Sequence, residues 1–110
     1  MKVFISQPMR DKTNEEIKAE RARIVIVCKN KYPGEDIEII DSFFEDAPHD
    51  ATPLWFLGKS LQLLSTADLA FFAKGYECAR GCVIEYECAL AYGINHIEEG
   101  EVIFDDGQNI

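Results

Sequence analysis

Residues 74–93 carry the side chains best suited to chemistry. The apolar run 69–73 before them is long enough for a buried strand, and helical spacing then places Ile84, Cys88 and Ala91 on one side. The segment therefore predicts a strand, a glycine-bearing loop and the start of a helix. Open α/β sheets bind ligands at such junctions, beyond the carboxyl ends of the strands.

Glu85 is the candidate catalytic residue of this segment. We expect it in about the first turn of the helix, where unpaired backbone N–H groups and the helix dipole favour an anion. A carboxylate there stays ionised near neutral pH, as a nucleophile must. The alternative is a first-turn glutamate that only complements the helix dipole.

Three segments are expected to converge at the strand ends, namely residues 6–10, residues 74–81 and Glu85. The candidate substrate-binding residues are Ser6, Gln7, Met9, Arg10, Lys74, Gly75, Tyr76, Arg80 and Gly81. Cationic side chains among them could meet a phosphate or balance Glu85, and the glycines suit close approach of the backbone to a ligand. The alternative for Arg10 is a solvent-exposed side chain before a helix.

Four aromatic residues in or beside predicted loops could stack on a planar ring. They are Phe43, Phe44, Trp55 and Tyr76. Each could equally cover the core, and Tyr76 has the best location of the four for ligand stacking.

The elements that must position these residues alternate along the chain. Residues 2–6 predict the first strand. Thr13 and Glu16 form a capping-box signature for a helix that ends by Tyr32. Its apolar face follows Ile17, Arg21, Ile24 and Cys28.

Residues 37–41 predict a second strand, and Thr52 with Pro53 predicts the start of a second helix. An apolar stripe on that helix is expected to face the sheet and comprises Leu54, Leu57, Gly58, Leu61 and Leu64. After the third strand and the Glu85 helix, residues 94–97 predict a fourth strand and 102–104 a possible fifth.

This alternation predicts one α/β domain spanning residues 1–110. Right-handed crossovers leave few topologies, and we expect a flavodoxin-like, Rossmann-like three-layer sandwich. Its parallel sheet of four to five strands would have the order 2-1-3-4, with a fifth strand at the end.

Composition narrows the functional class. The formal net charge is −9, from 11 basic and 20 acidic residues, which argues against a nucleic-acid polymer as partner but permits a small nucleotide. No apolar run approaches a membrane span, and no signal-peptide pattern precedes Ser6, so we expect a cytoplasmic protein without membrane contact. The four cysteines, Cys28, Cys78, Cys82 and Cys88, are expected to be reduced, and we expect no metal or other cofactor.

One spacing resembles a known family. Gly81, Glu85, Ala89, Ala91 and Gly93 reproduce the G-x-x-x-E-x-x-x-A-x-A-x-G pattern of the nucleoside 2-deoxyribosyltransferase superfamily, which includes the 2′-deoxynucleoside 5′-phosphate N-hydrolases. The chain is most similar to the small uncharacterised bacterial and phage members. The resemblance implies the same flavodoxin-like order.

The resemblance also implies roles. Glu85 would attack the anomeric carbon of a nucleoside, releasing the base and leaving a glycosyl-enzyme ester, as in retaining glycosidases. Residues 3–9 resemble the family's first-strand sequence I-Y-x-x-G-P-M, and Arg10 aligns with an arginine that holds the 5′-phosphate in the N-hydrolases. The chain departs from the family at three positions whose side chains assist the reaction in the family. Phe4 replaces a tyrosine, and Ser60 and Lys74 replace aspartates.

Three functional interpretations follow. The first is an enzyme acting on the N-glycosidic bond of a (deoxy)nucleoside or nucleoside monophosphate. The second is a non-catalytic nucleotide-binding module, which the departures favour. The third is a structural or interaction domain. Family members complete their sites across a dimer interface, so we expect a homodimer or higher homo-oligomer.

Overall fold

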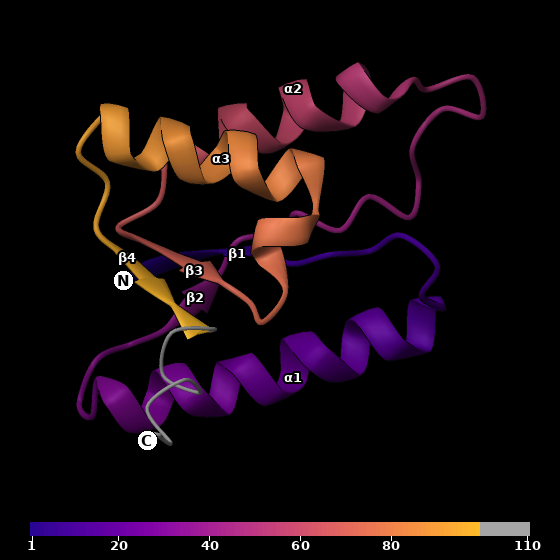
Figure 1. Cartoon of the computed structure of the whole chain (residues 1–110). Coiled ribbons are helices and arrows are strands. Elements are labelled where there is room, and N and C mark those ends of the chain that lie inside the picture. The colour runs from indigo at the N-terminus through magenta and orange to yellow at the C-terminus, as the bar shows by residue number, and fades with distance from the viewer. Residues whose placement is uncertain (100–110) are drawn as a thin grey trace, which may run out of the picture.

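The computed structural model describes residues 1–99, which form a parallel sheet with helices on both faces (Figure 1). The strand order is β2-β1-β3-β4. The strands are β1 (Lys2–Ser6), β2 (Glu38–Ile39), β3 (Leu69–Phe72) and β4 (His96–Glu98). Order and direction confirm the predicted three-layer α/β sandwich. The predicted strand at 102–104 lies outside the described residues.

Three α-helices flank the sheet in the described part of the chain. Helix α1 (Asn14–Lys31) covers one face, and α2 (Pro53–Leu64) and α3 (Arg80–Ala91) cover the other (Figure 1). A short 3-10 helix, η1 (Tyr76–Cys78), connects β3 to α3. None of the helices described is long and apolar enough to cross a membrane.

Side-chain caps fix the starts of α1 and α2 as predicted. The Thr13 hydroxyl accepts the Glu16 N–H at 3.1 Å, and the Glu16 carboxylate accepts the Thr13 N–H at 2.8 Å. The Thr52 hydroxyl accepts the Trp55 N–H at 3.1 Å, just before Pro53 at the first helical position.

Alternation along β1 distributes its side chains between two core layers. Val3 and Ile5 pack toward α1, whereas Phe4 packs on the α2–α3 side. The same alternation sends Ser6 toward α3 and Gln7 toward α1, where each makes hydrogen bonds. The end of β1 therefore supplies polar side chains to both layers.

The predicted apolar stripe of α2 is wrong in part. Leu54 is 76% exposed and Gly58 is also exposed, and among the residues of α2 only Leu64 is buried. The amino-terminal part of α2 borders a cavity instead of packing on the sheet. Only the last turn of α2 therefore contributes fully to the core.

Helix α3 differs from the prediction in its start and its buried face. It begins at Arg80, so Glu85 lies in the second turn, beyond most of the dipole effect on which the sequence argument relied. Its buried residues are Cys82, Glu85 and Ala89, whereas Ala91 is exposed. A buried polar residue thus occupies the inner face, which hydrophobic spacing alone does not predict.

Two strands are shorter or shifted relative to their predictions. Only Glu38 and Ile39 form β2, although the Ile40 N–H still donates to the Val3 carbonyl at 2.9 Å. The fourth strand is His96–Glu98 instead of residues 94–97. The short β2 leaves the following loop with few sheet hydrogen bonds to hold it.

Candidate functional site

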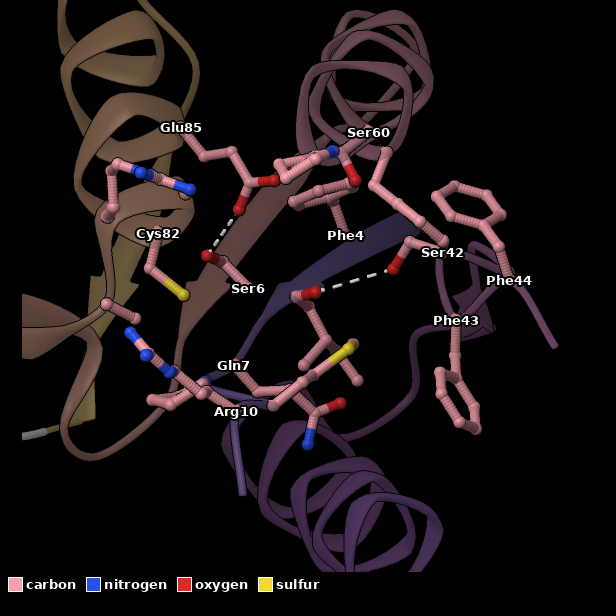
Figure 2. Close-up of a pocket in the computed structure, with 18 of the residues that line it drawn as sticks. Phe4, Ser6, Gln7, Arg10, Ser42, Phe43, Phe44, Ser60, Cys82 and Glu85 are labelled. Carbon is pink, nitrogen blue, oxygen red and sulfur yellow. Dashed lines mark hydrogen bonds between the residues drawn. The ribbon is translucent and has the colours of Figure 1, made fainter. Parts of the chain in front are cut away.

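Glu85 lies inside the protein at the end of β1. Its side chain is 7% exposed, and its Oε1 accepts a hydrogen bond of 2.6 Å from the Ser6 hydroxyl (Figure 2). Ser60 of α2 also acts on this carboxyl group and lowers its pKa. Elements β1, α2 and α3 therefore converge on one carboxyl group.

Two opposing effects act on the pKa of Glu85. Burial raises the pKa above its ordinary value, because desolvation disfavours the charged form. The hydrogen bonds from Ser6 and Ser60 lower it, since they stabilise the carboxylate. Burial is the larger effect, so the expectation of a dipole-stabilised carboxylate is corrected. Glu85 is a desolvated acid that two hydroxyls partly compensate.

Glu85 borders a cavity of about 840 Å³ at the carboxyl ends of the strands. Its walls come from β1 and the loop after it, from the loop after β2, from α2, and from the first two turns of α3 with the residues just before them. This is the position at which open parallel sheets bind ligands. The volume is sufficient for a nucleotide-sized molecule, since ligand pockets typically measure about 300–1,000 Å³.

The two sides of the cavity differ in chemical character. Glu85, Ser6 and Arg10 lie on one side, and Phe43 and Phe44 lie opposite (Figure 2). Phe56 of α2 extends the aromatic side, and its ring centroid lies 6.4 Å from that of Phe44. We call Phe43, Phe44 and Phe56 the aromatic wall. A ligand with a planar apolar part and a polar part matches this arrangement.

Seven of the predicted site residues line the cavity. They are Ser6, Gln7, Met9, Arg10, Arg80, Gly81 and Glu85. Arg10 and Arg80 are exposed, as a cation at the mouth of a cavity would be. The sequence therefore located the strand end, the loop and the helix that form the site.

Three predicted site residues, Lys74, Gly75 and Tyr76, are not among those that line the cavity. Gly75 has a φ of 88° and turns the chain into η1, which directs Tyr76 into the core, where it is 6% exposed. Tyr76 packs against Phe72 and is therefore unavailable for ligand stacking. The exposed Lys74 donates its backbone N–H to the Glu99 carboxylate.

Gln7 lines the cavity, but its amide group is engaged by α1. Its Nε2 donates to Oε1 of Glu20 at 2.7 Å and to the Ile17 carbonyl at 3.4 Å. Its Oε1 accepts from Nη1 of Arg21 at 2.9 Å. Gln7 therefore connects the loop after β1 to α1, which differs from the predicted role of ligand contact.

The sequence missed several residues of this site. Ser42, Pro53, Phe56, Cys78 and Cys82 all line the cavity and were not predicted as ligand contacts. Ser42 and Phe56 lie on a loop and a helix face that sequence spacing does not orient. Cys82 offered a signal, because it lies three residues before Glu85 and therefore on the same helix face.

Cys82 is a buried thiol next to the carboxyl group. Burial raises its pKa to about 11, so the thiol stays protonated near neutral pH. The Ser6 hydroxyl acts in the opposite direction and partly lowers this pKa. A protonated Cys82 contributes no negative charge beside Glu85 and is a poor nucleophile.

Within residues 1–99, no group of three or more His, Cys, Asp or Glu side chains is arranged to hold a metal ion. All four cysteines are free. The fold and the site define an open parallel α/β protein with one buried acid in a strand-end cavity. Comparisons with protein-family models, curated proteins and solved structures find no match to this chain.

Proposed function

We propose that the protein cleaves or transfers the N-glycosidic bond of a (deoxy)nucleoside or a nucleoside monophosphate, with Glu85 as nucleophile. The observation that carries the proposal is the Glu85 carboxyl group, held by the Ser6 hydroxyl at 2.6 Å beside a cavity of about 840 Å³. The glycine and alanine spacing around Glu85 supports the same chemistry through its resemblance to the deoxyribosyltransferase superfamily.

The proposed reaction has two steps. A Glu85 oxygen attacks C1′ of the sugar, and the C1′–N bond breaks with its electron pair leaving on the base, which takes a proton from water. A glycosyl ester of Glu85 remains. Water or a second base then attacks C1′, the ester bond breaks, and the carboxylate is regenerated with net retention at C1′.

The hydroxyls around Glu85 support this proposal despite the departures from the family. Phe4, at the family's tyrosine position, has no polar group, but Ser6 lies two residues further along the same face of β1 and bonds Glu85. Ser60, at a family aspartate position, also lowers the pKa of Glu85. The Ser6 bond holds the carboxylate in place, and both hydroxyls favour its ionised form.

The cavity walls suit the two ends of a nucleotide. The aromatic wall offers flat apolar surfaces on which a nucleobase can stack. Arg10 and Arg80 border the same cavity and can bond a phosphate at the other end of the ligand. Nucleoside monophosphates are therefore the substrates we favour over free nucleosides.

A specific observation favours the alternative, a non-catalytic nucleotide-binding module. Among the described residues that line the cavity, Glu85 is the only one with a carboxyl group. That lining therefore supplies no second carboxylic acid to protonate the departing base, as retaining glycosidases do. On this alternative Glu85 would not attack the ligand.

Free base detected by chromatography tests the proposal. We would incubate the protein with deoxynucleosides and with deoxynucleoside 5′-monophosphates, in parallel with Glu85→Gln and with Glu87→Gln. Glu87 is the matched control, because it is exposed on the same helix two residues away. We expect turnover by the wild type and by Glu87→Gln, and loss of turnover in Glu85→Gln.

Other outcomes separate the alternatives. Nucleotide binding without turnover, unaltered by Glu85→Gln, would establish the binding module. Neither binding nor turnover with any nucleotide would exclude both functions and leave an interaction domain.

The same proposal includes the assembly and location of the protein. We propose a homodimer or higher homo-oligomer, supported by Leu54 and Tyr92, which are 76% and 82% exposed. Four free cysteines support a cytoplasmic location. Sedimentation at several concentrations tests the oligomeric state. The proposed chemistry uses the protein's own nucleophile and no cofactor.

A further inference from the structure

Arg21 is a charged residue on the inner face of α1. It continues the stripe of Ile17, Ile24 and Cys28, all of which are buried. Burial lowers the pKa of its guanidinium, while the charge of Asp41 raises it. A half-buried arginine loses hydration, so its N–H groups require partners within the protein.

The guanidinium bonds three acceptors that come from separate segments. Its Nη1 donates to Oε1 of Gln7 at 2.9 Å, in the loop after β1. Its Nη2 donates to the Ile40 carbonyl and to the Ser42 hydroxyl, both at 3.1 Å, in the segment after β2. One side chain of α1 therefore bonds both the loop after β1 and the segment after β2, and both of these line the cavity.

The hydrogen bonds of Arg21 act in a region where the sheet provides few backbone hydrogen bonds. Strand β2 has two residues, and after Ile40 the described backbone makes no further ladder bond to β1. The Ser42 hydroxyl donates to the Ile5 carbonyl at 3.4 Å, a long contact, so Arg21 is the stronger attachment of this loop.

The attached loop leads directly into the aromatic wall. Phe43 and Phe44 follow Ser42 in the sequence and line the cavity. Phe44 packs edge-on against Trp55, with ring centroids 5.9 Å apart. A change at Ser42 should therefore move the wall and alter the surroundings of Trp55.

We infer that Arg21 is a positioning residue, which through Gln7, Ile40 and Ser42 holds the aromatic wall in place across the cavity from Glu85. Its effect on nucleotide affinity rests on the proposed function, whereas its effect on the loop does not. Arg21 lies outside both segments that resemble the deoxyribosyltransferase superfamily, namely residues 3–9 and residues 81–93. The role is read from the contacts alone.

Trp55 is the single tryptophan of the chain and reports on the wall without any ligand. We would measure acrylamide quenching of Trp55 in Arg21→Met, in Arg21→Lys and in the control Arg23→Met. Arg23 lies on the same helix, but its guanidinium bonds Glu99 at 2.6 and 3.0 Å and does not line the cavity.

We expect Arg21→Met to raise the quenching constant of Trp55 by about twofold or more while circular dichroism shows a folded protein, because the loop opens locally. Arg21→Lys should raise the quenching constant less than Arg21→Met, since an ammonium can bond one of the two loops but does not span both. Arg23→Met should match the wild type. Unchanged quenching in a folded Arg21→Met protein would overturn the inference.

A second variant covers the case in which Arg21→Met does not fold. Ser42→Ala removes the Arg21 bond to the Ser42 hydroxyl and the long contact to the Ile5 carbonyl, but it keeps the Arg21 bonds to Gln7 and Ile40. We therefore expect a smaller increase in quenching. Wild-type quenching in Ser42→Ala would then overturn the inference.

Nucleotide affinity provides the second measurement. With deoxyadenosine 5′-monophosphate as probe in calorimetry, Arg21→Met should weaken binding about tenfold, comparable to the loss of one charge-assisted hydrogen bond. If quenching rises but the wild type binds no nucleotide, the positioning role stands and the proposed function fails.

Discussion

The Ser6 hydroxyl and the Glu85 carboxyl group, 79 positions apart in the sequence, are joined by a hydrogen bond of 2.6 Å. Parallel pairing of Ser6 with Phe72 sets the end of β1 beside the end of β3, from which the chain continues into α3. The buried acid of this site therefore depends on the sheet register, because a one-residue slip would turn Ser6 away from α3.

Ser6→Ala removes that hydrogen bond and leaves Glu85 buried. The pKa of Glu85 should rise further, because desolvation remains and one stabilising bond is lost. We expect a loss of about 1–3 kcal/mol in the free energy of unfolding in urea at neutral pH. The pH at which glycosidic turnover is half-maximal should also rise, because Glu85 must be ionised to attack.

Ser65→Ala is the matched control, since the Ser65 hydroxyl is exposed and donates to the Gln62 carbonyl of the preceding turn. Ser65→Ala should lower the free energy of unfolding by much less than Ser6→Ala does. Equal effects of the two variants would show that the Ser6 bond contributes no more to stability than an exposed hydrogen bond.

Glu85→Gln should change how stability depends on pH. The folded-state pKa of Glu85 is raised above its ordinary value of 4.5, so the folded protein binds this proton more tightly than the unfolded chain. The contribution of Glu85 to the free energy of unfolding is therefore largest at low pH, and it declines as the pH rises from about 4.5 through the folded-state pKa. Glutamine has no such titration.

The measurement is urea unfolding of both proteins between pH 4 and pH 8, taken as a difference so that other titrating groups cancel. The stability of Glu85→Gln relative to the wild type should increase with pH. A difference that stays constant or decreases would show that Glu85 is not destabilised by burial.

Local signals in the sequence predicted much of the fold. Thr13 and Thr52 cap helices through atoms three residues away, β3 is a continuous apolar run, and β1 contains one at residues 3–5. Such features depend on neighbouring residues, and the structure confirms them. The parallel order followed from the alternation of these elements and from the handedness of crossovers.

The remaining features depend on distant contacts. Hydrophobic spacing grouped Ile84, Cys88 and Ala91 on one side of α3, whereas the buried residues are Cys82, Glu85 and Ala89. Spacing cannot anticipate that Ser6 and Ser60 accommodate a buried acid. Tyr76 is predicted to contact a ligand, because the neighbouring sequence does not indicate that Gly75 turns its side chain into the core. For Arg21 the signal was present: a charge within an apolar helical stripe indicates polar partners inside the protein.

Arg10 and Lys74 should differ as phosphate ligands. Arg10 lines the cavity, whereas Lys74 lies outside the cavity lining. We expect Arg10→Gln to weaken binding of a nucleoside monophosphate about tenfold, in the range of a charged hydrogen bond, and to leave binding of the free nucleoside unchanged. Lys74→Gln should bind both ligands like the wild type.

Calorimetry with deoxyadenosine and its 5′-monophosphate measures both affinities. A loss of monophosphate affinity in Lys74→Gln, with none in Arg10→Gln, would reverse the assignment. An equal loss for nucleoside and monophosphate in Arg10→Gln would show that Arg10 contacts another part of the ligand.

The cysteines should react with thiol reagents at very different rates. Cys78 is exposed at the cavity, whereas Cys82 is 5% exposed, and burial raises its pKa to about 11 from an ordinary 9.0. At neutral pH, Cys82 therefore carries much less thiolate than an ordinary thiol, in addition to being shielded from the reagent.

Peptide mapping by mass spectrometry after brief iodoacetamide treatment should find Cys78 modified before Cys82. Saturating deoxyadenosine 5′-monophosphate should slow the labelling of Cys78, because a ligand in the cavity covers that side chain. Cys88, which is partly buried and does not line this cavity, is the internal control and should label at the same rate with and without nucleotide. Protection of both Cys78 and Cys88 would indicate a change that extends from η1 through α3. Protection of neither would place the nucleotide outside this cavity.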